Sequence, residues 1–172
     1  MAEEVRLEPM GEAHLDATCR WLADAELRAQ VDCLEPPTPE GNRTLWLARW
    51  ADRRREDYAI LAAGRHVGNC GLCDIDRARG KAQFWIYLGE ERGRGVGRQA
   101  LEHLLHRAFV ELGLARVHLR VLADNPRAIA FYRALGFVEE GRLRRDSVRD
   151  GRSVDALCFA MLADEYATHT PA

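Results

Sequence analysis

The pattern of apolar and polar positions divides the chain into strands and helices. Runs of apolar and β-branched residues predict strands, and apolar residues three or four apart predict helices. Strands are expected at 5–9, 58–63, 66–73, 82–88, 117–122, 143–148 and 154–161. Helices are expected across 14–30 (one broken or two consecutive), from 45 to the arginines at 53–55, from the glycine loop at 91–98 to 112, and at 126–135. A short polar tail is expected after Glu165. This order favours one domain, residues 1–172, with a mixed α/β sheet and helices on its faces.

A glycine-rich loop lies between the strand at 82–88 and the long helix. It is Glu91-Arg92-Gly93-Arg94-Gly95-Val96-Gly97-Arg98. Alternate glycines let backbone N–H groups approach an anion, and the following helix start favours negative charge. The other interpretation is a turn with solvated arginines. Neither a Walker A loop nor a dinucleotide fingerprint fits, because no Gly-Lys-Ser/Thr follows and Arg98 stands where a third glycine would fall. We predict a phosphate-binding loop.

A second pattern runs from Val121 to Phe137. Asn125 is expected to cap a helix that begins at Pro126 and ends at Gly136. Tyr132 falls on the apolar side of this helix. Taken alone, Asn125 is explained as a cap and Tyr132 as a core aromatic residue.

Together, the two patterns resemble those of the GNAT N-acetyltransferases. Arg92 to Gly97 matches Arg/Gln-x-x-Gly-x-Gly/Ala, and Asn125 follows Gly97 by 28 residues. The likeness covers roughly residues 58–161 and is closest to the ribosomal-protein alanine, spermidine and amino-sugar acetyltransferases. It implies the GNAT fold, an α/β (α+β) arrangement. Its twisted, mostly antiparallel sheet is flanked by helices, and the parallel strands at 82–88 and 117–122 splay apart to bind acetyl-CoA.

The resemblance also implies which residues bind acetyl-CoA. They are Trp85, Ile86, Tyr87, Leu88, Arg92, Gly93, Arg94, Gly95, Val96, Gly97, Arg98, Asn125, Ala128 and Tyr132. The strand backbone would pair with the pantetheine arm, Asn125 would bond that arm, and Tyr132 would face the sulfur as the catalytic residue. A phenol with a pKa near 10 can protonate a leaving thiolate, and a backbone N–H near Ile86 or Tyr87 can polarise the thioester oxygen.

The proton acceptor for the incoming amine stays open. Gln83 stands where many relatives carry glutamate, and an amide cannot act as a general base. Glu35, Asp74 and Asp76, acting through water, are candidates for this role.

The expected acceptor is a small-molecule primary amine: a polyamine, an amino sugar or an amino acid. A protein N-terminal amine is the alternative enzyme substrate, and a non-catalytic acyl-CoA-binding domain is the alternative class. Asp32, Glu35 and Gln83 are the predicted acceptor-binding residues. With Asp24 and Glu26, the first two form an acidic cluster that favours cationic amines.

Charge and composition exclude other classes. The net charge is −2, and the basic run at 53–55 is followed at once by two acidic residues, so no nucleic-acid partner is expected. With neither a membrane-spanning apolar run nor the features of a signal peptide, a cytoplasmic location and no membrane partner are expected. A homodimer is compatible with the sequence but not indicated by it.

The five cysteines do not suggest a disulfide framework. Cys70 and Cys73 form a C-x-x-C pair near His66, but no second pair completes a zinc site. We interpret them as small structural thiols in a strand, and we expect no metal.

Overall fold

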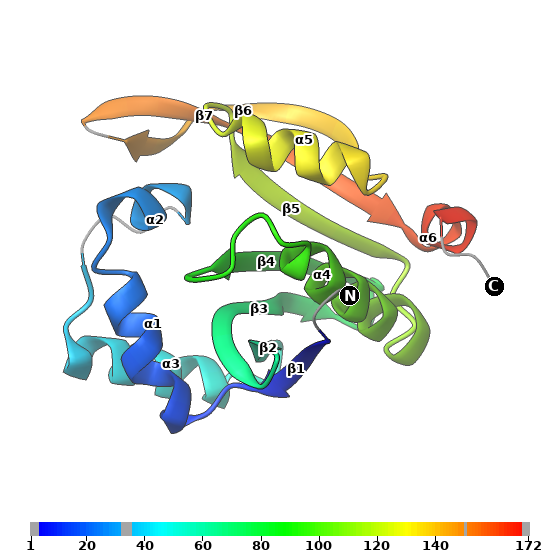
Figure 1. Cartoon of the computed structure of the whole chain (residues 1–172). Helices are drawn as coiled ribbons and strands as arrows, with labels where there is room; N and C mark the ends of the chain where they lie inside the picture. The colour runs from blue at the N-terminus through cyan, green and yellow to red at the C-terminus, as the bar shows by residue number, and fades with distance from the viewer. Residues whose placement is uncertain (1–3, 32–35, 150, 170–172) are drawn as a thin grey trace.

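The computed structural model describes residues 4–31, 36–149 and 151–169. In this part of the chain the strands form one seven-stranded sheet in the order β1-β2-β3-β4-β5-β7-β6 (Figure 1). The strands are β1 (Val5–Pro9), β2 (Glu56–Ala62), β3 (Arg65–Asp76), β4 (Lys81–Leu88), β5 (Arg116–Leu122), β6 (Val138–Arg149) and β7 (Arg152–Leu162). β6 and β7 are antiparallel neighbours, with Arg149 paired to Arg152; Asp150 lies outside the described residues.

Helices cover both faces of the sheet. They are η1 (Glu12–His14), α1 (Leu15–Trp21), α2 (Ala25–Gln30), α3 (Pro39–Ala51), α4 (Val96–His106) with a π-helical turn η2 (Arg107–Glu111), α5 (Pro126–Ala134) and α6 (Ala163–His169). Figure 1 shows α1, α2 and α3 grouped together, away from α4 and α5. α1 and α2 show that the segment 14–30, expected as one broken helix or two consecutive helices, forms two consecutive helices. The polar tail expected after Glu165 is wrong, because α6 continues and Tyr166 stacks against Phe109 at 5.1 Å.

The sheet is mostly antiparallel, and β4 and β5 are its parallel pair. Their pairing covers three residues of each strand and ends at Gln83 and His118, although β4 runs on to Leu88 and β5 to Leu122. The second half of β4 keeps its antiparallel pairing with β3. The sheet therefore splits between β4 and β5, as the GNAT fold requires, and the predicted fold class is confirmed.

Two apolar clusters hold the helices to the sheet. On one face, Phe84 of β4 and Phe159 of β7 pack with Leu101 of α4 and Tyr132 of α5. On the other face, the cluster of Met10, Leu15, Trp46 and Ala59 joins α1 and α3 to β2 and is flanked by Trp85. Successive residues of a strand point to opposite faces. Phe84 therefore faces α5, and its neighbours Gln83 and Trp85 face the side of α1 and α3.

Candidate active site

The glycine loop has the backbone conformation that the sequence predicted. Gly93 and Gly95 have φ of +85° and +81°, in the left-handed region that L side chains rarely adopt. A Cβ at Gly95 would meet no atom within 4 Å, so conformation rather than crowding requires glycine there. The N–H groups of Arg98 and Gln99 donate to the Gly95 carbonyl at 3.1 and 3.2 Å. The first N–H groups of α4 have no acceptor within the helix and can bind an anion.

The arginines of the loop are not equally available. Arg94 pairs with Glu91 at 2.9 Å, and Arg65 of β3 also reaches Glu91, at 2.5 Å. Arg92 donates from Nε to the Leu88 carbonyl at 3.1 Å. Arg127, which sequence reasoning missed, extends from α5 so that its Nη2 lies 3.8 Å from the position of a Cβ on Gly93. Its place two residues after the Asn125 cap was the available signal.

Beyond the split, β4 presents one edge without a neighbouring strand. Trp85, Ile86, Tyr87 and Leu88 are half-buried, and their register partners on β3 run from Gly71 back to Gly68. Backbone N–H and C=O groups alternate between the two sides of a strand, so part of this backbone faces the gap toward β5. An extended chain with amide groups fits that edge by adding hydrogen bonds as a strand would.

Asn125 confirms the predicted helix cap. Its Oδ1 accepts a hydrogen bond from the N–H of Ala128 at 3.1 Å. Because the oxygen is engaged, the side-chain NH2 group is the part of Asn125 that remains to bond another molecule. Ala128 is half-buried on the first turn of α5.

Tyr132 lies in an aromatic cage on the α5 side of the sheet. Its side chain is buried, with 8% exposure, and the ring centroids of Phe84, Phe131 and Phe137 lie 6.3, 5.3 and 5.7 Å away. Burial raises the pKa of Tyr132 above its usual value, so its hydroxyl stays protonated near neutral pH. Such a phenol can donate a proton but cannot serve as a base.

The predicted acceptor residues are only partly placed. Gln83 lies on the α1 and α3 face, opposite Cys73 of β3 and His118 of β5. Asp32 and Glu35 lie outside the described residues. Asp24, from the same acidic cluster, caps α2 by accepting from the N–H of Glu26 at 2.9 Å.

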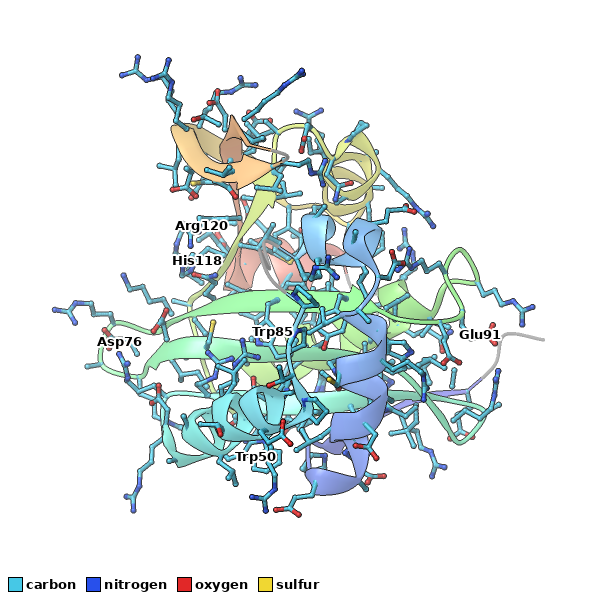
Figure 2. All side chains as sticks on the ribbon, turned by 90° about the vertical axis from the view of Figure 1, so that its left-hand side faces the viewer. Trp50, Asp76, Trp85, Glu91, His118 and Arg120 are labelled. Atoms are coloured by element: carbon cyan, nitrogen blue, oxygen red, sulfur yellow. The ribbon has the colours of Figure 1, made fainter. Side chains whose placement is uncertain are left out.

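The two other candidate bases are not brought to Tyr132. Asp76 is bonded to Arg79 at 2.8 Å, and Asp74 lies 3.8 Å from Arg54 with its side chain 65% exposed. Both follow Cys73 at the end of β3 that pairs with the start of β4. Figure 2 shows Asp76 and Glu91 at opposite ends of the sheet, with Trp85 between them.

A buried polar network that the sequence analysis did not predict joins α1 to the middle of the sheet. Asn69 of β3 donates to Thr18 at 2.9 Å and to the Tyr87 hydroxyl at 2.7 Å, and it contacts His66 at 2.8 Å. In the loop, Glu90 accepts from Trp21 of α1 at 3.1 Å. These bonds fix α1 against the part of β4 that leads into the glycine loop.

The cysteine pair lies in β3, as expected. Cys70 is fully buried, and burial raises the pKa of both the Cys70 and Cys73 thiols. Across residues 4–31, 36–149 and 151–169, no group of three or more His, Cys, Asp or Glu side chains is arranged to hold a metal ion. No helix of the described chain is long and apolar enough to cross a membrane.

Comparison with known proteins decides the family. Residues 4–138 match the family model described as "Acetyltransferase (GNAT) domain". The chain belongs to the GNAT acetyltransferase family. It is 33% identical over 172 residues to the uncharacterized N-acetyltransferase p20 of Bacillus licheniformis, covering 96% of both proteins. It is 31% identical over 136 residues to the L-methionine sulfoximine/L-methionine sulfone acetyltransferase of Pseudomonas aeruginosa, covering 74% of this chain and 76% of that enzyme.

The fold agrees with solved GNAT structures. The spermidine N-acetyltransferase of Vibrio cholerae, solved with CoA and spermine, superposes with a TM-score of 0.88 at 23% identity, covering 95% of this chain and 98% of that one. The resemblance first suggested by two motifs is thereby confirmed. The GNAT protein uses acetyl-CoA as its acyl donor, and the left-handed glycines, the open edge of β4 and the cap at Asn125 fit that molecule.

Proposed function

We propose that this GNAT protein acetylates the primary amine of a small molecule by direct attack on the thioester, without an acyl-enzyme. The observation that carries this is the split that opens after Gln83 and His118. Tyr132 lies on one face of the split sheet, and Gln83 and Trp85 lie on the other. A thioester held in the split would expose its sulfur toward Tyr132 and its carbonyl to an amine from the side of α1 and α3.

Each group then has a role that its chemistry supports. Backbone N–H groups near Ile86 and Tyr87 stabilise the negative charge that develops on the carbonyl oxygen. Tyr132 donates its proton to the sulfur as the C–S bond breaks. The phosphate-binding loop with Arg92 and Arg127 holds the pyrophosphate. Cys70 and Cys73 are excluded as acyl carriers, because raised pKa values keep them as poorly nucleophilic thiols.

The choice of a small-molecule acceptor rests on the relatives. The P. aeruginosa relative is named for two amino-acid derivatives and the V. cholerae enzyme for a polyamine. Both are small amines of different charge. The acidic cluster that includes Asp32 and Glu35 supports a cationic acceptor, and the first acceptors to assay are therefore polyamines.

An acceptor panel tests the proposal. Thiol release from acetyl-CoA is measured with polyamines, amino sugars, amino acids and peptides with a free N-terminal alanine, and products are identified by mass spectrometry. Amine-dependent release with a small molecule as the best acceptor is expected. Preference for peptides would point to protein N-terminal acetylation. Tight acetyl-CoA binding without any amine-dependent turnover would support a non-catalytic binding domain.

A further inference from the structure

Among the described residues, none of the groups considered so far is placed to take the proton from the incoming ammonium, and Glu35 lies outside that part of the chain. Gln83 has no basic side chain, Asp76 is held by Arg79, and Tyr132 stays protonated. An amine attacks only through its unprotonated lone pair, and amines of the lysine type have a pKa near 10.4. A base close to the split would take this proton as the amine enters the reaction.

His118 lies at the point where the split begins. It is the register partner of Gln83 in the last residue pair that joins β4 to β5. Its neighbours Val117 and Leu119 belong to the cluster shared with Tyr132, so alternation directs His118 to the opposite face, with Gln83 and Trp85. Figure 2 shows His118 and Arg120 above and to the left of Trp85. His118 is thus on the face from which the amine would approach.

One nitrogen of the His118 imidazole has no hydrogen-bond partner among the described residues, although the backbone of Ala82 raises the pKa of the ring through a hydrogen bond. Nδ1 is buried without a hydrogen-bond partner in the described chain, and the side chain as a whole is half-buried. The second ring nitrogen is Nε2. A neutral imidazole carries its proton on one nitrogen and a lone pair on the other. With the proton on Nδ1, Nε2 is free to accept one.

The surroundings keep His118 neutral. The charged and titratable groups near it on β4, β5, β6 and β7 are Lys81, Arg116, Arg120, Glu140, Asp146 and Cys158. Burial lowers the pKa of His118, and the positive charges of Arg116 and Lys81 lower it further, while Ala82 and Glu140 act in the opposite direction. Glu140 and Asp146 are paired to Arg116 and Arg120, at 2.5 and 3.0 Å. The ring is consequently an unprotonated acceptor at neutral pH.

We infer that Nε2 of His118 accepts the proton of the acceptor ammonium, directly or through one water; this rests on the proposed function. The ammonium gives one proton to His118, and the neutral nitrogen attacks the thioester carbonyl. As the C–N bond forms and the C–S bond breaks, nitrogen loses a second proton and the departing sulfur gains one from Tyr132. The second proton of nitrogen also passes to His118 after the ring has released the first to solvent, and Tyr132 regains its proton from solvent, so one proton is released in total. Acid and base therefore act from opposite faces of the split sheet.

The test compares His118→Gln with His106→Gln, a control at the exposed end of α4. At pH 7.5, kcat of His118→Gln with a polyamine or other best acceptor should fall on the order of 10²-fold or more. Acetyl-CoA affinity by calorimetry should be unchanged, and His106→Gln should match the wild type. With an acceptor already neutral at this pH, such as an aryl amine or a hydrazide, most of the loss should disappear. A merely structural histidine would lower activity with both kinds of acceptor alike.

Two measurements on the unaltered chain accompany the variants. The wild-type kcat should decline on the acid side, and NMR titration of the His118 ring should give a pKa below the usual 6.5. If His118→Gln does not fold, these two results test the inference. A kcat that does not change with pH on the acid side, or a His118 ring that is protonated at pH 7, would overturn it. If the wild-type chain acetylates amines and His118→Gln keeps the same kcat, only the assignment of His118 as the base is overturned. If the wild-type chain shows no amine-dependent turnover, both the proposed function and the assignment of His118 as the base are overturned.

Discussion

The Oδ1 atom of Asn125 accepts the N–H of Ala128 at 3.1 Å, so this side chain caps α5, and we propose that its NH2 group also bonds acetyl-CoA. Substitution separates these two tasks. Asn125→Ser keeps a capping oxygen but removes the NH2 donor, and it should weaken acetyl-CoA binding with little change in stability. Asn125→Ala should weaken binding similarly and also cost about 1 kcal/mol of unfolding free energy. Calorimetry and urea denaturation check both; undiminished affinity in the serine variant would restrict Asn125 to capping.

Gly95 offers a matched test of the phosphate-binding loop. Gly95 and Gly113 both have positive φ, and a Cβ at either would meet no atom within 4 Å. Valine at either position should therefore cost a similar backbone strain, about 1–2 kcal/mol. Gly95→Val alone should abolish acetyl-CoA binding, because its side chain blocks the approach of an anion to the N-terminus of α4. Equal affinities of the two folded variants would remove the phosphate-binding assignment.

Stability should fall as the pH drops below about 6.5. Burial lowers the pKa of His66 and of His118, so the unfolded chain takes up protons at a higher pH than the folded chain does. Protonation then favours unfolding, and the contribution is fully present above the unfolded pKa. Urea denaturation between pH 8 and pH 5 measures it. His66→Gln should flatten part of the decline.

The cysteine pair should be dispensable for catalysis. Cys70 is enclosed in the core and its pKa is raised well above the usual value, so it can serve neither as nucleophile nor as a ready metal ligand. A folded Cys70→Ser, Cys73→Ser variant should lose stability through the buried hydroxyl but keep its turnover. Complete loss of activity in that variant, or stoichiometric zinc by elemental analysis, would contradict this.

Local signals were sufficient for much of the fold. Some features depend only on the residues of one short segment. Examples are the glycines of the loop, the Asn125-Pro126 start of α5 and the alternation of apolar and polar residues in the strands. The register of β4 on β5 is different, because it joins residues 35 positions apart such as Gln83 and His118. The sequence therefore predicted a split but not the histidine at its origin.

The features that the sequence analysis did not predict, or predicted wrongly, have a similar cause. α6 is polar except for a single aromatic anchor, Tyr166 on Phe109, which is too weak a pattern to predict a helix. Asp74 and Asp76 looked like free carboxylates, but Arg54 and Arg79 engage them. Arg127 approaches Gly93 only because α5 packs beside the loop. Such contacts depend on tertiary packing, which periodicity does not specify.

Tyr132→Phe tests the central claim most directly, since it removes one hydroxyl and keeps the ring among Phe84, Phe131 and Phe137. The measurement is kcat of the folded variant with the best amine, under conditions where chemistry limits the rate. If Tyr132 protonates the leaving thiolate, kcat should fall on the order of 10²–10⁴-fold while the acetyl-CoA dissociation constant stays the same. A kcat close to that of the wild type would contradict a transfer reaction organised around Tyr132 at the split between β4 and β5.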